Sequence, residues 1–442
     1  MQDASLLKVL AKSFLAGDPA VEQIVLRCSR TLGRRWRWLR PLAQRYVKTF
    51  AGRTRPRQRD VIDFLHRDKG LRRARSKYSA EIAPVQSLLE PQQMRPVAAT
   101  GEWGLPPIES PGALAEWLAL EIGELLWFAD LKGLEYRKYQ PKLSHYRYHV
   151  QVKQSGGIRI IEEPKPRLKQ IQRQILSQIL DKIPVHPAVH GFVKGRSIKT
   201  FVTPHVAKRV VLRMDLQDFF PSFSASRIQT FFRTLGYPEA VADLLGGICT
   251  NATPRIVWRT SWITADPHQR QELRMVYSRP HLPQGAPTSP ALANLCVYRV
   301  DCRLAGLARS AGAAYTRYAD DLAFSGDATF ERRVERFSTH VAAILLEEGL
   351  RVHHRKTRVM RLGVRQRLTG LVVNQRLNVA RRDLDQLKAI LTNCVRLGPD
   401  SQNREAHPNF RSHLEGRVGF VEMINPAKGR RLRKIFEGIQ WQ

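Results

Sequence analysis

Two adjacent carboxylates, Asp320 and Asp321, lie within residues 316–324, TRYADDLAF, between flanks rich in apolar and β-forming side chains. This pattern predicts a β-hairpin with both aspartates at its tip. Neighbouring acids repel each other, so a pair held this closely calls for a cation, and paired Mg²⁺ suits carboxylate oxygens. The alternative is two solvated loop aspartates, and the tetrad alone does not decide between the two.

A third carboxylate supports the metal interpretation. Asp215 follows an apolar strand candidate at residues 210–214 and precedes two aromatic residues, Phe219 and Phe220. Two-metal phosphoryl transfer uses acids that bridge two ions about 3.5–4 Å apart, and an acid at the end of a second, buried strand can complete such a set. Between the acidic motifs, residues 282–290, LPQGAPTSP, form a rigid Pro/Gly turn that leads into a helix over residues 291–307.

These three motifs, in this order, resemble the palm of a reverse transcriptase, and the closest likeness is to bacterial retron reverse transcriptases. The resemblance covers about residues 110–442 and implies an α+β fold of the right-hand polymerase type, with fingers, a palm built on an antiparallel sheet, and a helical thumb. The expected division is a basic helical N-terminal extension (1–80), a Pro-rich linker (81–110), fingers and palm (111–370) and thumb (371–442).

The resemblance implies roles for the acidic residues. Asp215, Asp320 and Asp321 are expected to hold two Mg²⁺ ions, one at the primer 3′-hydroxyl and one at the triphosphate and leaving group. Lys356, in the basic turn at residues 350–357, corresponds to a lysine that can protonate the departing pyrophosphate.

Four residues are expected to bind the incoming nucleotide. Residues 149–161 predict a hairpin that carries Lys153 and Arg159, and in the resembling polymerases such a hairpin lies over the triphosphate. Phe220 stands at the offset of an aromatic ring that excludes ribonucleotides, and Gln284 lies in the Pro/Gly turn. The alternatives are two surface cations on a hairpin and an ordinary core phenylalanine.

Two regions are expected to bind RNA. The glycine-punctuated loop at residues 190–198 carries Lys194 and Arg196, which suit template phosphates, and retron enzymes have a similar stretch here. Residues 27–77 hold eighteen Lys or Arg against three Asp, interleaved with Trp36, Trp38, Tyr46 and Phe50. That mixture predicts contact with phosphates and exposed bases. The alternative is a set of amphipathic helices whose aromatics pack inward and whose arginines are solvated.

The composition agrees with a nucleic-acid enzyme. A formal net charge of +34 over 442 residues favours phosphate-rich partners, here an RNA template and primer, an RNA–DNA product and dNTPs. No apolar run approaches the ~18 residues of a membrane span, and the N-terminus opens no signal peptide. The five cysteines include no Cys-x-x-Cys pair, which favours neither a disulfide framework nor zinc. We expect a cytoplasmic protein.

The resemblance implies a polymerase that copies a structured noncoding RNA into RNA-linked single-stranded DNA (msDNA) for antiphage defence, alongside a separately encoded effector. Two departures concern RNA recognition more than polymerisation. Retron enzymes usually carry Asn-Ala-x-x-His where residues 201–205 read FVTPH, and Val where Leu368 precedes Thr369. The alternatives are another bacterial defence or group II intron-like reverse transcriptase, and an RNA-binding scaffold with an inactive palm.

Overall fold

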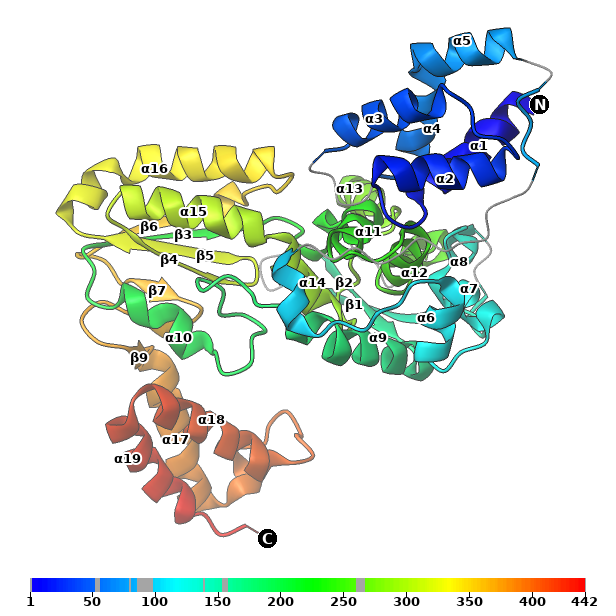
Figure 1. The fold of residues 1–442 in the computed structure, drawn as a ribbon. Helices are drawn as coiled ribbons and strands as arrows, with labels where there is room; N and C mark the ends of the chain where they lie inside the picture. The colour runs from blue at the N-terminus through cyan, green and yellow to red at the C-terminus, as the bar shows by residue number, and fades with distance from the viewer. Residues whose placement is uncertain are drawn as a thin grey trace. The chain divides into compact units, whose positions relative to one another are not determined.

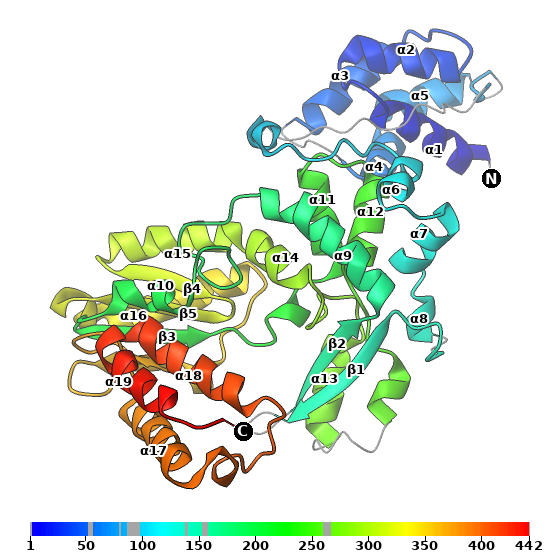
Figure 2. The ribbon, with the colours of Figure 1, turned by 90° about the horizontal axis from the view of Figure 1, so that it is seen from below.

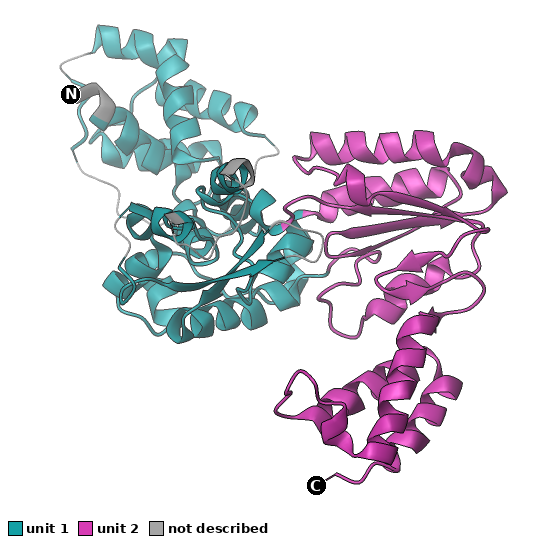
Figure 3. Ribbon diagram, turned by 180° about the vertical axis from the view of Figure 1, so that it is seen from behind, with its two compact units in different colours: residues 1–184, 220–296 teal, residues 185–219, 297–442 magenta. Residues whose placement is uncertain are grey.

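The computed structural model describes residues 2–51, 56–78, 81–85, 98–137, 140–152, 158–259 and 267–441 (Figure 1). Lys153 and the turn at residues 155–157 lie outside the described residues. The chain divides into two compact units, coloured separately in Figure 3: Met1–Pro184 with Phe220–Cys296, and Val185–Phe219 with Val297–Gln442. We call them unit 1 and unit 2.

Unit 1 begins with a helical bundle that has its own hydrophobic core. Its helices are α1 (Gln2–Leu15), α2 (Val21–Thr31), α3 (Leu39–Thr49), α4 (Gln58–Arg67) and α5 (Lys69–Lys77). Trp36, Tyr46 and Phe50 are 4–8% exposed in this core, and Trp38 packs against it. The prediction that these aromatics face exposed bases is therefore wrong: in a bundle this small, the large rings supply the apolar area that folding needs.

The rest of unit 1 surrounds a hairpin of two antiparallel strands, β1 (Tyr146–Val152) and β2 (Ile158–Pro164). Ser110 caps α6 by accepting a hydrogen bond from the Ala113 N–H, and Pro111 is the first helical residue, as the sequence predicts. The helices of this part are α6 (Pro111–Trp117), α7 (Ile122–Ala129), α8 (Leu134–Arg137), α9 (Pro166–Gln178), α11 (Ala225–Thr234), α12 (Glu239–Ile248), α13 (Pro267–Tyr277) and α14 (Ser289–Cys296).

Unit 2 is built on a four-stranded antiparallel sheet with the order β4-β5-β3-β6. Its strands are β3 (Val210–Asp215), β4 (Ala314–Tyr318), β5 (Asp321–Gly326) and β6 (Arg358–Arg361). Helices α15 (Tyr298–Ser310) and α16 (Ala328–Glu347) cover one face, and α10 (Ile198–Val202) lies on the other (Figure 1). Both faces are covered, so β3 and β5 read as nearly continuous apolar runs rather than as an alternation.

Beyond the sheet, unit 2 continues through the short strands β7 (Arg367–Leu368), β8 (Leu371–Val372) and β9 (Asn378–Val379) into a helical bundle. Helices α17 (Arg381–Leu397), α18 (Phe410–Ile424) and α19 (Pro426–Glu437) lie side by side (Figure 2) around a core of their own. Lys199 on α10 donates to the Met423 carbonyl at 2.9 Å, which links the bundle to the sheet. Within the described part of the chain, every helix is too short or too polar to cross a membrane.

A buried ion pair anchors the Pro/Gly turn in unit 1. His281 Nε2 lies 2.9 Å from Glu162 Oε2, and its Nδ1 lies 2.7 Å from the Arg279 carbonyl oxygen, so both ring nitrogens face acceptors. Burial lowers the pKa of His281, but the charge and hydrogen bond of Glu162 outweigh burial and raise that pKa above its usual 6.5. Both side chains are almost completely buried. The two acceptors and the raised pKa favour an imidazolium that the Glu162 carboxylate holds.

We expect His281→Asn to destabilise the protein by roughly 3 kcal/mol, because Glu162 would keep a buried charge without its partner. The pKa of His281 is raised on folding, so the stabilisation is fully present below pH ~6.5 and is lost as the pH rises through the higher folded pKa. Urea unfolding at several pH values measures the slope. His149→Asn is the control, because His149 and Glu163 form an exposed pair on the same hairpin. Equal destabilisation in both variants, or a pH slope that persists in His281→Asn, would contradict the assignment.

Candidate active site

The register of the central strands brings the three predicted acids to one end of the sheet in unit 2. Asp215, the last residue of β3, pairs with Asp321, the first residue of β5. The Leu216 N–H then donates to the Asp320 carbonyl at 2.9 Å. Residues more than a hundred positions apart in sequence are thus fixed next to each other by backbone hydrogen bonds.

The predicted hairpin is confirmed: Tyr318 pairs with Asp321, which leaves Ala319 and Asp320 as a two-residue turn. Ala319 adopts a φ of +54°, a left-handed conformation that costs a non-glycine residue about 1 kcal/mol. Two-residue hairpin turns of the favoured types require a positive φ at this position, where glycine is usual. The turn that carries Asp320 is therefore a conformation that its surroundings must hold.

Burial and mutual repulsion act on these carboxylates. Burial, reinforced by the charges of Asp215 and Asp321, raises the pKa of Asp320 to about 6. Burial also raises the pKa of Asp321, against the opposing effect of Arg213, whose Nε and Nη2 donate to Asp321 Oδ1 at 2.9 and 2.7 Å. Lys356 Nζ lies 2.9 Å from Asp215 Oδ1. Two cations of the chain thus offset part of the negative charge.

The donor chemistry of this cluster fits divalent metal ions, because three carboxylates supply hard oxygen ligands and gain from a cation between them. Even so, within the described ranges no group of three or more His, Cys, Asp or Glu side chains is arranged so that it could hold a metal ion. Asp215 and Asp321 face Lys356 and Arg213 instead. Each of these cations engages the Oδ1 atom of its carboxylate, so an ion at this cluster would share the carboxylates with Lys356 and Arg213.

The chain after β3 explains where Lys356 lies. Gln217 N–H donates to the Arg351 carbonyl at 2.8 Å, and His353 N–H donates to the Asp215 carbonyl at 2.7 Å. This pairing places the 3₁₀ turn η6 (His354–Lys356) beside the end of β3. The side chain of Lys356 is about half exposed, so it reaches Asp215 from the solvent side.

The two cations of the glycine-punctuated loop differ in their surroundings. Lys194 is exposed, whereas Arg196 Nη1 donates to the carbonyls of His186, Pro187 and Val189. Arg196 therefore stabilises the loop itself, and Lys194 is the better placed of the two to meet a phosphate. Their binding of RNA stays a prediction.

Two histidines near the turn are uncharged at neutral pH. His190 Nδ1 lies 2.9 Å from Thr200 Oγ1, and burial, together with Arg196, lowers the pKa of His190 to about 4. Burial lowers the pKa of His205 to about 3, and its ring nitrogens lie 2.7 Å from the hydroxyls of Ser325 and Thr316. His205, the one residue that FVTPH shares with the usual retron element, therefore joins β4 to β5.

The predicted nucleotide-binding residues that the structure describes belong to unit 1. Arg159 is exposed on β2, opposite Gln151. Phe220 is half buried at the start of the 3₁₀ turn η4 (Phe220–Ser222). The Gln284 carbonyl accepts a hydrogen bond from the Glu162 N–H at 2.8 Å, and a Cβ at Gly285 would lie 2.8 Å from the Glu162 carbonyl oxygen. Only glycine lets the Pro/Gly turn approach β2 this closely.

Sequence reasoning missed Arg213 and the buried pair of Arg317 with Asp301, although a signal existed for each. Arg213 precedes Asp215 by two residues, so the period of a strand places both side chains on one face of β3. Arg317 interrupts an otherwise uncharged strand, and a charge in such a strand requires a buried partner. Neither pattern predicts the partner, because Asp321 and Asp301 belong to other secondary-structure elements than the arginines that they bind.

Comparison with known proteins agrees with the geometry. The family model described as "Reverse transcriptase (RNA-dependent DNA polymerase)" matches residues 151–376. The chain is 39% identical to the Retron Mx65 reverse transcriptase of Myxococcus xanthus over 344 residues, 76% of this chain and 73% of that protein. It is 38% identical to the Retron Mx162 reverse transcriptase of the same organism, over 74% of this chain and 66% of that protein. It is 30% identical to the Retron Ec86 reverse transcriptase of Escherichia coli, over 65% of this chain and 79% of that protein.

The chain belongs to the reverse transcriptase family, as an RNA-directed DNA polymerase of the bacterial retron type. The expected α+β polymerase fold with an antiparallel palm sheet is thereby confirmed. Reverse transcriptases use divalent metal ions, RNA templates and dNTPs, which accords with an acidic cluster on a chain of strongly positive net charge.

We expect Gly191→Ala to reduce primer extension at least ~10-fold, because a displacement of the turn that carries Asp320 by about 1 Å would misplace the candidate acid. A Cβ on Gly191 would lie 2.6 Å from the Ala319 nitrogen, so the loop or the turn must move. Gly306→Ala is the matched control, because a Cβ there meets nothing within 4 Å. Wild-type extension by a folded Gly191→Ala protein would show that the close approach does not position the turn.

Proposed function

We propose that this polymerase copies a structured noncoding RNA into single-stranded DNA that stays joined to RNA, and that it uses two Mg²⁺ ions held by Asp215, Asp320 and Asp321. The observation that carries the proposal is the convergence of these three acids at one end of β3 and β5, in a chain of the retron type. The retron resemblance further supports a role in antiphage defence with a separately encoded effector.

In this proposal each residue has a distinct task. The ions, when bound, neutralise the triphosphate and activate the primer hydroxyl. Lys356, whose Nζ lies 2.9 Å from Asp215 Oδ1, donates a proton to the departing pyrophosphate. Arg159, with Lys153, attracts the triphosphate, and Gln284 presents the Pro/Gly turn to the nucleotide. Phe220 excludes a ribose 2′-hydroxyl by overlap.

We expect Asp321→Asn to lower Mg²⁺-dependent dNTP incorporation at least ~10³-fold, because asparagine keeps the size of the side chain but loses the charge that binds the ion. Primer extension on an RNA template measures the decrease, and circular dichroism checks the fold. Asp385→Asn, an exposed position on α17, is the control and should retain activity. A folded Asp321→Asn protein with wild-type synthesis would refute the assignment.

Sequencing of the nucleic acid that copurifies with each of these variants tests the template and the product. Wild-type protein and the Asp385→Asn control should carry one noncoding RNA joined to DNA, and the Asp321→Asn protein should carry the RNA alone. DNA copied from many unrelated RNAs would instead favour a defence polymerase without a dedicated template. RNA without DNA in every preparation would favour an inactive scaffold.

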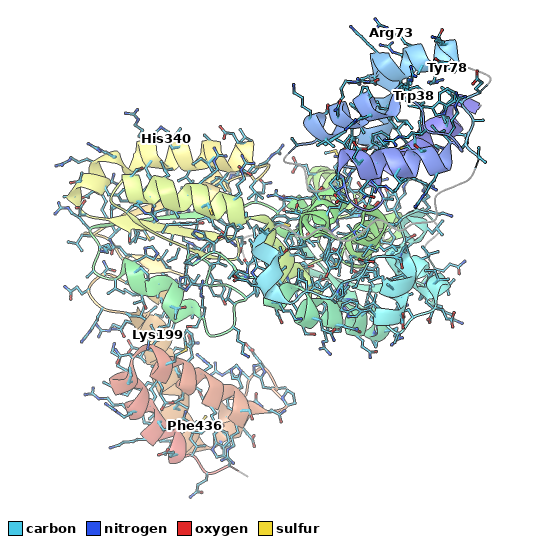
Figure 4. The ribbon with its side chains drawn as sticks, viewed as in Figure 1. Trp38, Arg73, Tyr78, Lys199, His340 and Phe436 are labelled. Atoms are coloured by element: carbon cyan, nitrogen blue, oxygen red, sulfur yellow. The ribbon has the colours of Figure 1, made fainter. Side chains whose placement is uncertain are left out.

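The N-terminal bundle is the second part of the proposal: we propose that it binds the RNA through phosphates. Trp36, Tyr46 and Phe50 are buried in its core, so the proposal rests on the exposed basic side chains. Arg73 lies on the outer surface of α5 (Figure 4), and Lys69 and Arg72 are exposed on the same helix. Three cations on one short helix form a compact surface for a phosphate backbone.

We expect the triple variant Lys69→Gln, Arg72→Gln, Arg73→Gln to weaken RNA binding and to reduce the slope of log K against log salt by roughly 0.7–0.9 for each phosphate that the variant no longer neutralises. Arg332→Gln, Arg333→Gln, Arg336→Gln on the exposed side of α16 removes the same charge elsewhere and is the control. Fluorescence anisotropy with labelled RNA at several salt concentrations gives both slopes. Identical slopes for the two triple variants would show that α5 makes no specific contribution.

A further inference from the structure

A fully buried ion pair lies directly behind the turn that carries Asp320. Arg317 on β4 and Asp301 on α15 are both 0% exposed, with Nε to Oδ1 at 2.8 Å and Nη2 to Oδ2 at 2.7 Å. Tyr315, two residues earlier on the same face of β4, donates its hydroxyl to Asp301 Oδ1 at 2.8 Å. Asp301 thus holds the arginine in a bidentate arrangement that fixes the plane of the guanidinium.

The third edge of the same guanidinium reaches the turn. Arg317 Nη1 donates to the Ala319 carbonyl at 3.1 Å, two residues along the chain. Ala319 is the residue with a left-handed backbone, and its carbonyl belongs to the peptide that continues into Asp320. The side chain of Arg317 therefore connects a buried carboxylate on α15 to the strained part of the hairpin.

The backbone of Arg317 is tied to the glycine-punctuated loop as well. Its N–H donates to the Ala188 carbonyl at 2.8 Å, and its carbonyl accepts from the His190 N–H at 2.7 Å. Gly191 then passes so close to Ala319 that a Cβ would lie 2.6 Å from the Ala319 nitrogen. One residue is thus bonded to the loop, to the helix and to the turn.

We propose that Asp301 and Arg317 are positioning residues that hold Ala319 in its left-handed conformation within the Ala319–Asp320 turn and so set the direction of the Asp320 carboxylate. This proposal rests on the proposed role of Asp320 as a metal ligand. A buried ion pair is weak evidence for stability, since apolar residues of similar volume often stabilise a fold equally well. What distinguishes this pair from apolar residues is the directional hydrogen bond from Arg317 to the Ala319 carbonyl, which an apolar side chain cannot make.

Arg317→Lys tests the proposal most directly, because lysine keeps the charge but cannot bond Asp301 at two points and Ala319 at the same time. We expect kcat for primer extension to fall roughly 10- to 100-fold, as expected for a misplaced catalytic group, while the KM for dNTP changes less than about threefold. The Mg²⁺ concentration for half-maximal rate should rise, and Mn²⁺ binding measured by electron paramagnetic resonance should weaken. Tyr315→Phe, which removes one hydrogen bond to Asp301, should show a smaller change of the same kind.

Rescue by glycine separates positioning from a general structural role. Glycine adopts a positive φ without penalty, so adding Ala319→Gly to Arg317→Lys should restore part of kcat and of Mn²⁺ binding. The control is Arg303→Met. Arg303 lies on α15, like Asp301, and the variant removes its ion pairs with Glu347 and Glu348 but should leave kcat unchanged. Thermal unfolding of every variant confirms that the assays are made on folded protein.

Each outcome either supports or overturns the positioning role. If Arg317→Lys loses thermal stability but keeps wild-type kcat and Mn²⁺ binding, or if its kcat defect is equally large with Ala319→Gly present, the pair serves the fold alone and the proposal is overturned. If Asp320→Asn itself polymerises like the wild type, the proposed function of the aspartates fails first. Loss of activity in Asp320→Asn, together with rescue of Arg317→Lys by Ala319→Gly, supports both.

Discussion

The main electrostatic constraint on unit 2 is the concentration of negative charge at one end of two buried strands. Asp215, Asp320 and Asp321 meet there because β3 and β5 pair in one register, and burial with mutual repulsion raises the pKa of Asp320 to about 6. Carboxylates in such an arrangement are costly unless cations compensate them. Part of the compensation comes from Arg213 and Lys356, which contact Oδ1 of Asp321 and Oδ1 of Asp215. A divalent ion at the same carboxylates would compensate more of the negative charge.

Both units use buried ion pairs to hold turns rather than to join helices. In unit 1, Glu162 pairs with His281 through its side chain and bonds Gln284 through its backbone N–H. In unit 2, Arg317 pairs with Asp301 and bonds the Ala319 carbonyl. In each case one member of a buried ion pair also makes a hydrogen bond to a turn, the Pro/Gly turn in unit 1 and the Ala319–Asp320 turn in unit 2. Shielding strengthens each hydrogen bond and makes a misplaced partner expensive, which favours a single geometry.

The cations behind the net charge of +34 serve different purposes. Some offset the charge of the clustered aspartates, as Arg213 and Lys356 do, and others hold a loop, as Arg196 does through three carbonyls. Those on the outer face of the N-terminal bundle have a different character, because they surround a complete hydrophobic core and are exposed. A basic surface on an independently packed bundle suits a sequence-independent attraction to phosphates, whereas the cations near the aspartates have fixed partners.

The sequence by itself determined the acidic hairpin, the strand that ends at Asp215, the N-cap at Ser110 and the family, because these features are written in short-range patterns of two to nine residues. Only the tertiary structure decided which charges meet. Arg213 could be assigned to the face of Asp215 from its spacing, but not to the carboxylate of Asp321, 108 residues away. Likewise, the helix that supplies Asp301 to Arg317 and the inward direction of Trp36 and Tyr46 follow from packing between segments. The physical reason is that periodicity sets the face on which a side chain lies, whereas its partner depends on the register and packing of chain segments that are distant in sequence.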